Sequence, residues 1–109
     1  MKRSEKVVLS VPVDMKGEKV TEIEVRRPTV ADEEDAMDMA IQMGKSENRI
    51  TLEICSYAKV TGLKYDTIRS MDADDFVKIR AAYSRVVAPL ELNEKVGEAD
   101  ATSEQQKSA

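Results

Sequence analysis

The sequence predicts an α+β fold: an N-terminal antiparallel β-hairpin, a small three-to-four-helix bundle and a disordered acidic C-terminal tail. Apolar and polar residues alternate across residues 6–27, which is typical of strands that bury one face. Behind capping residues, apolar residues then recur at helical spacing over residues 29–88. One Val is the only sizeable apolar residue in 94–109, so burial there cannot offset the entropy of ordering the chain. We therefore expect one domain over residues 1–89 and a disordered tail over residues 90–109.

The hairpin is expected to bury one face of each strand. Its inward side chains are Leu9, Val11, Ile23 and Val25. Residues 14–18 form the connecting loop, with Gly17 in a left-handed conformation. Pro12 has no N–H to donate, which places it at a strand end or on an edge. Because an isolated hairpin is only marginally stable in water, other elements must cover its apolar face.

The first helix is predicted to begin after Thr29, whose hydroxyl caps it. Asp32 stands at the third helical position and completes a capping box, and Gly44 ends the helix. The packed stripe is expected to consist of Ala36, Met37, Ala40, Ile41 and Met43, which recur at helical spacing. Met39 falls off this stripe.

A second helix is predicted from about residue 47 to residue 60. Its apolar positions are Ile50, Ile54, Cys55, Tyr57 and Ala58. Gly62 is expected to end the helix in a left-handed conformation, with Leu63 folding back onto it, as in a Schellman-type stop.

Two further capping residues divide the rest of the helical region. Asp66 can cap a short helical turn over residues 67–71. Asp72 is expected to cap a last helix over residues 73–87, with Asp75 at the third helical position of a capping box. The helical region is therefore expected to contain three long helices and one short turn.

Composition argues against several classes of protein. The formal net charge is −4, from 17 Lys and Arg and 21 Asp and Glu, and the chain has no His. Neither nucleic acid nor a membrane is an expected partner, because there is no basic stripe and no apolar run of the roughly 20 residues that a membrane span needs. Without His, and with Cys55 on an apolar helix face, we expect no catalysis, no cofactor and no metal site.

The acidity is concentrated in residues 31–48, which sum to −5, and in residues 90–109, which sum to −3. Residues 32–35 could form a hard-cation site, but charge at a helix N-terminus is the better interpretation because consecutive helical side chains diverge. The methionines of the first helix fit either core filling or an adaptable partner-binding face. On the second interpretation, the candidate partner-binding residues are Asp32, Glu33, Glu34, Met37, Met39 and Met43.

Two sequence blocks carry a family resemblance. The first is Val-Val-Leu-Ser-Val-Pro-Val at residues 7–13, continued by residues 17–32 with Arg-Arg-Pro-Thr-Val-Ala-Asp at their end. The second is Val-Thr-Gly-Leu at residues 60–63, followed by Ile-Arg-Ser-Met-Asp-Ala-Asp-Asp-Phe at residues 68–76. In this order, and with the helices between them, the blocks resemble the Mu-type bacteriophage tail assembly chaperones.

This resemblance implies a specific function. Such chaperones are made in the cytoplasm of the infected bacterium, bind the tape measure protein and keep it soluble until tail-tube proteins polymerise around it. They are absent from the mature virion, they tend to self-associate, and in many phages a ribosomal frameshift produces a longer second form. A different hypothesis rests on the acidity and small size alone: a phage-encoded adaptor or regulator that binds a host protein.

Overall fold

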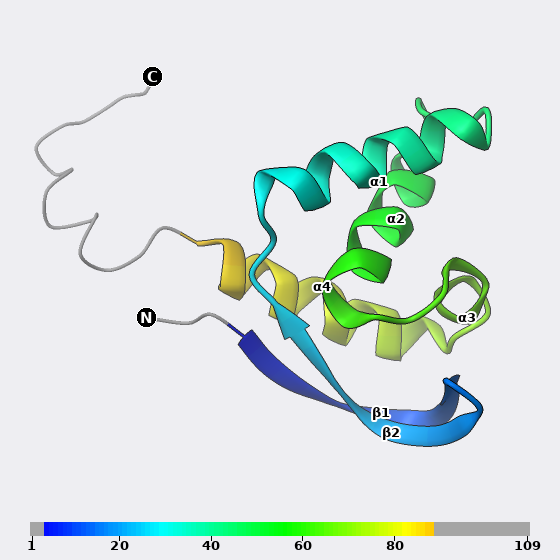
Figure 1. The fold of residues 1–109 in the computed structure, drawn as a ribbon. Coiled ribbons are helices and arrows are strands. Elements are labelled where there is room, and N and C mark those ends of the chain that lie inside the picture. The colour runs from blue at the N-terminus through cyan, green and yellow to red at the C-terminus, as the bar shows by residue number, and fades with distance from the viewer. Residues whose placement is uncertain (1–3, 89–109) are drawn as a thin grey trace, which may run out of the picture.

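The computed structural model describes residues 4–88 as a two-stranded antiparallel sheet followed by four helices (Figure 1). The elements are β1 (Ser4–Met15), β2 (Glu18–Arg26), α1 (Val30–Gln42), α2 (Arg49–Thr61), α3 (Tyr65–Arg69) and α4 (Ala73–Val87). The predicted hairpin followed by three to four helices is therefore confirmed. The tail expected over residues 90–109 lies outside the described residues.

A tight turn and a large bulge shape the hairpin. Lys16 and Gly17 both have positive φ, 52° and 86°, as a two-residue type I′ turn requires, which confirms the left-handed Gly17. The strands pair from Met15↔Glu18 to Val13↔Val20, and again from Val8↔Glu22 onward. Between Val13 and Val8 the first strand uses five steps and the second only two, so β1 bulges away from β2.

The bulge changes which side chains of β1 are buried. Leu9, Ile23 and Val25 are buried as predicted, but Val11 is 48% exposed, so its predicted inward orientation is wrong. The strict alternation of a strand fails here because the backbone at Ser10 and Val11 bends to donate its N–H groups to α4 and not to β2. Pro12 lies in the same bulge, where no ladder hydrogen bond is required of it.

The main core lies between the hairpin and helices α2 and α4. Its buried members are Val7, Leu9, Val13, Ile23, Val25, Ile54, Tyr57, Val60, Leu63, Ile68, Ile79, Ala82 and Val86. The Tyr57 ring lies 5.0 Å from that of Tyr83 and 5.4 Å from that of Phe76, centroid to centroid. These contacts join α2 to α4 above the sheet, so the helices cover the apolar face that the hairpin could not bury alone.

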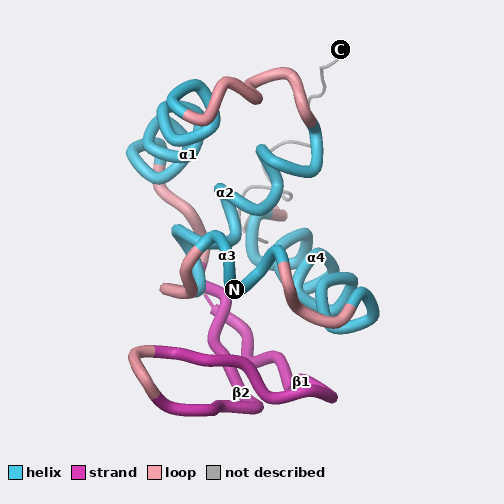
Figure 2. The backbone as a smooth tube through the Cα atoms, turned by 90° about the vertical axis from the view of Figure 1, so that its right-hand side faces the viewer, coloured by secondary structure: helices cyan, strands magenta, loops and turns pink. Residues whose placement is uncertain are grey.

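Helix α1 lies on the far side of α2 from the hairpin (Figures 1 and 2). It packs there through a separate, smaller cluster of Ala36, Ala40 and Cys55, with Met39, Leu52 and Tyr65 at its margin. Small side chains let two helices approach closely, but they bury little apolar surface. Hydrophobic burial therefore attaches α1 less strongly than it attaches α4.

Local capping sets most helix ends. The capping box of Thr29 and Asp32 is present, Asn48 caps α2, and Gly62 ends α2 with a left-handed φ of 81°. Leu63 folds back into the core, although its N–H bonds to the Thr61 hydroxyl in place of the Schellman carbonyl (3.1 Å). Helix α3 begins at Tyr65 without a side-chain cap, so the predicted cap at Asp66 is wrong.

Candidate partner-binding surfaces

The described residues contain no group of three or more His, Cys, Asp or Glu side chains that could hold a metal ion. Cys55 is buried, and this burial raises the pKa of its thiol. Over residues 4–88 no helix is both long and apolar enough to cross a membrane. What the described surface does present is two apolar regions, one on α1 and one between α2, α3 and α4.

The first region is the outer face of α1, defined here as Val30, Glu34, Met37 and Ile41. These residues follow one another at intervals of four, three and four, so they form one stripe along the helix. Val30 is 82% exposed and Ile41 is 55% exposed, and Met37 is also exposed. The stripe faces away from α2 and makes an apolar surface with acidic side chains on it and beside it.

Two residues of the predicted packed stripe lie on this outer face. Met37 and Ile41 are exposed, and so is Met43 at the end of the helix, so core filling is the wrong interpretation for these members of the predicted stripe. The packed stripe instead contains Ala36, Met39 and Ala40, so the expectation that Met39 lies off it is also wrong. The periodicity of α1 fits both stripes, and the alanines pack because they allow the closer approach to α2.

The six candidate residues of the first helix therefore have different surroundings. Glu33, Glu34 and Met37 are exposed, and Met43, at the C-cap of α1, is more than one-third exposed. Met39 is half-buried against the small cluster that joins α1 to α2. The Asp32 carboxylate is hydrogen-bonded to Arg26 and Thr29 within the fold.

Asp32 joins the end of the hairpin to the start of α1. Its carboxylate accepts two hydrogen bonds from the Arg26 guanidinium, at 2.6 and 3.0 Å, and one from the Thr29 N–H at 2.8 Å. The bonds from Arg26, followed by that from Thr29, hold the pKa of Asp32 well below its usual range. Arg26 also donates to the Lys59 carbonyl at 3.1 Å, so one guanidinium connects β2, α1 and α2.

The second region is an apolar groove, called the α2–α4 groove below. Its apolar lining consists of Ile50, Ile54, Ile68, Met71, Phe76 and Val77, and its volume is about 370 Å³. Ile50 and Val77 are each about half exposed at its margin. Ile50 was expected among the apolar positions of the second helix, but it faces the groove and is not buried. The sequence pattern of a single helix could not predict the groove, because α2, α3 and α4 all contribute to its lining.

Two arginines, Arg69 and Arg80, line the edge of the groove. The Arg80 guanidinium donates to both carboxylate oxygens of Glu53, at 2.6 and 2.9 Å, and its Cζ lies 5.2 Å from the centroid of the Phe76 ring. Arg69 also lines the groove and makes no ion pair within residues 4–88. The segment that forms the groove, 49–88, sums to +2, whereas 31–48 sums to −5.

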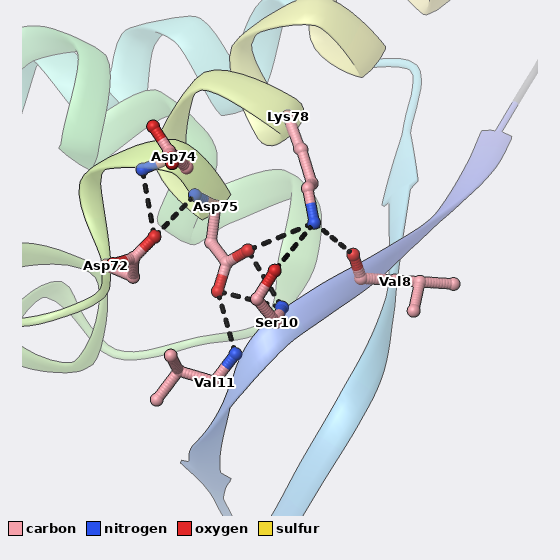
Figure 3. A network of polar contacts seen from close by, with 7 residues as sticks. All are labelled: Val8, Ser10, Val11, Asp72, Asp74, Asp75 and Lys78. Carbon is pink, nitrogen blue, oxygen red and sulfur yellow. Dashed lines mark hydrogen bonds and ion pairs between the residues drawn. The ribbon is translucent and has the colours of Figure 1, made fainter.

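A buried carboxylate joins α4 to the bulge of β1 (Figure 3). Asp75 is 0% exposed and accepts the N–H of Ser10 at 2.9 and 3.1 Å and that of Val11 at 3.1 Å. The Lys78 ammonium lies 3.3 Å from the same carboxylate and donates to the Val8 carbonyl and the Ser10 hydroxyl. Burial raises the pKa of Asp75, but the bonds from Ser10 and Val11 and the nearby Lys78 outweigh it, so the pKa lies below its usual value.

The predicted role of Asp75 is therefore wrong. Asp72 caps α4 as expected, by accepting the N–H groups of Asp74 and Asp75. The Asp75 side chain, however, turns away from the helix end and bonds to the strand. The buried carboxylate accepts the two N–H groups of the bulge that do not pair with β2.

These features define a protein of the α+β class: a hairpin joined to helices, with one exposed apolar surface beside acidic side chains and another beside arginines. The family model described as phage tail assembly chaperone proteins, E, or 41 or 14, matches residues 6–88. The chain belongs to this family of phage tail assembly chaperones. Membership implies interaction with tail proteins and suggests a non-enzymatic role. No curated protein and no solved structure matches the chain significantly.

The residues that carry the resemblance have structural positions. In the first block, Arg26, Thr29 and Asp32 form the junction between the hairpin and α1. In the second, Gly62 ends α2, and Asp75 joins α4 to β1. Residues of both blocks therefore hold elements of this fold together, while Glu34, Met37 and Ile41 of the outer face of α1 lie between the blocks.

Proposed function

We propose that this chain is a chaperone that binds the tape measure protein, keeps it soluble until tail-tube proteins polymerise around it, and is absent from the mature virion. The exposed apolar stripe on α1 is the observation that carries the proposal, together with membership of the family. A long helical tape measure protein exposes apolar surface before assembly, and a helix with an apolar stripe can cover it. The acidic side chains beside the stripe would keep the complex soluble by charge repulsion between complexes.

We propose the partner-binding residues within the same helix. Glu33, Glu34, Met37 and Met43 would meet the partner directly, because their side chains are exposed. Asp32 and Met39 would act by holding α1 in place, Asp32 through Arg26 and Met39 through the cluster on α2. We further propose that the protein works in the cytoplasm of the bacterial host, self-associates, and has a longer frameshifted form, which the DNA downstream of its gene would reveal.

The proposal is tested by co-expression with an amphipathic segment of the tape measure protein from the same phage. Wild type should keep the segment soluble, and Met37→Glu should not, because it places a charge within the apolar stripe. Gln42→Glu adds the same charge at an exposed position on another side of α1 and should behave as wild type. A segment that precipitates equally with and without the wild-type protein overturns the function, and equal solubility with Met37→Glu overturns only the assignment to this face.

A further inference from the structure

We propose that the outer face of α1 of one copy docks into the α2–α4 groove of a second copy, forming a head-to-tail contact. This inference deepens the proposed self-association by naming both of its surfaces, and it concerns the same α1 face that is proposed to bind the tape measure protein. Both surfaces are present on every copy, and within residues 4–88 no side chain covers either of them. The contact therefore needs no second kind of protein.

The groove is large enough to accept apolar side chains from a helix. Val30, Met37 and Ile41 project from one side of α1, at the spacing by which an amphipathic helix presents its anchors to a groove. The groove has a volume of about 370 Å³, within the rough range of 300–1,000 Å³ of binding pockets. Its margin is apolar at Ile50 and Val77, which would be covered together with the anchors.

The charges of the two surfaces are complementary. Glu34 lies within the α1 stripe, whereas Arg69 lies at the groove with no ion pair in the described part of the chain. The Arg80 guanidinium is already hydrogen-bonded to Glu53, so its charge is compensated. It forms a fixed side of the groove. An acidic helix is therefore a better occupant of this groove than a basic one.

Docking within one chain is excluded by the fold. Helix α1 uses Ala36 and Ala40 to pack on its own α2, which turns the outer face away from that chain's groove. Because face and groove are different surfaces, the contact is heterologous, and each copy can bind one neighbour on either side. Such contacts close into a ring or continue as a filament. They also cover the α1 face, so a docked neighbour and the tape measure protein would exclude each other.

The test uses two variants that each remove one surface. Ile41→Lys removes the α1 anchor, with Gln42→Lys as its control, and Val77→Glu removes the groove margin, with Ser84→Glu as its control on α4. By sedimentation velocity, wild type and both controls should form concentration-dependent species larger than a dimer. Each of the two variants should remain monomeric, with an unchanged circular dichroism spectrum.

Mixing the two variants gives the decisive result. Val77→Glu keeps its α1 face and Ile41→Lys keeps its groove, so the mixture should form a 1:1 dimer and nothing larger. Arg69→Gln, which leaves the apolar lining intact and removes the charge, should weaken association about tenfold and make it less sensitive to salt. A monomeric wild type, or a mixture that stays monomeric, overturns the contact.

The same variants separate this contact from the proposed function. Val77→Glu should still keep the tape measure segment soluble, because its α1 face is intact. If Val77→Glu loses that activity, the groove binds the tape measure protein and the proposed occupant is wrong. If wild type is monomeric and still keeps the segment soluble, the contact is wrong and the chaperone function stands.

Discussion

The hairpin and α4 are joined by a large apolar core and a buried carboxylate, whereas α1 is joined to α2 by two alanines and a cysteine. Both attachments use an ion pair, but Asp75 lies fully buried in its network and the Arg26–Asp32 pair lies at the surface. Surface ion pairs contribute little to stability compared with buried polar networks. The hairpin, α2 and α4 thus form a firmly packed scaffold, whereas α1 is attached to it through a small apolar cluster.

The difference shows how a small chain can fold and still offer apolar surface. Burying Met37 and Ile41 would have anchored α1 more strongly, but it would have left no apolar stripe for a partner. Regions with few buried apolar contacts open at lower free energy than the global unfolding transition. We therefore expect α1 to be the least stable helix of the fold, and the following variants test that comparison from the largest effect to the smallest.

Asp75→Ala should give the largest loss. It leaves the N–H groups of Ser10 and Val11 without an acceptor and Lys78 without its carboxylate, so the free energy of unfolding should fall by about 4 kcal/mol. Chemical denaturation measures the effect. Asp74→Ala removes a neighbouring exposed carboxylate of the same helix turn and should change stability by less than about 0.5 kcal/mol. Equal losses for the two variants would show that the network does not hold the hairpin.

Ile79→Ala compared with Met39→Ala tests the two packing regions directly. Ile79 is fully buried in the main core, so its truncation should cost about 3 kcal/mol. Met39 is half-buried at the margin of the α1 cluster, so its truncation should cost about 1 kcal/mol. Denaturant midpoints of both variants provide the measurement, and a larger loss for Met39→Ala would reverse the proposed order of the regions.

Thr29→Ala should have a smaller effect that is confined to α1. Removing its hydroxyl leaves the Asp32 N–H uncapped and should destabilise the helix by about 1 kcal/mol. Hydrogen exchange should accelerate in α1 and stay unchanged in α4. Faster exchange in both helices would mean that α1 and the scaffold unfold as one unit.

The smallest effect is expected in the pH dependence of the free energy of unfolding. Since the pKa of Asp75 is lower in the folded protein, its ionised form stabilises the fold above the unfolded-state pKa of about 3.9. That stabilisation is lost as the pH falls through the folded-state pKa. Between neutral pH and the unfolded-state pKa, this carboxylate does not make the free energy of unfolding depend on pH. Acid titration of wild type should therefore show a steeper loss of stability below about pH 4 than titration of Asp75→Ala, and parallel curves would contradict the assignment.

Local chemistry explains which features could be predicted from the sequence. The cap at Thr29, the turn at Gly17 and the helix end at Gly62 depend on a few neighbouring residues, and all three were predicted correctly. The orientation of Val11 depends on Asp75, which lies 64 positions away in the chain. Period-2 alternation cannot reveal a bulge whose hydrogen-bond acceptor comes from another element.

The candidate site shows the same limit. The apolar positions of the first helix could be listed from the sequence, but their periodicity could not decide which of two stripes packs on α2. Bulky Met37 and Ile41 fitted the expectation for a core, and small Ala36 and Ala40 provide the actual contact. The α2–α4 groove was not predicted, because its lining is assembled from three helices.

Hydrogen exchange of the chaperone, alone and with the tape measure segment, tests the central claim most directly. In the free protein, amides of α1 should exchange faster than those of α4, because α1 has the smaller attachment. On addition of the segment, protection should rise most strongly in α1. Protection that rises in the hairpin and α4 while α1 is unchanged would contradict the proposal that this helix binds the partner.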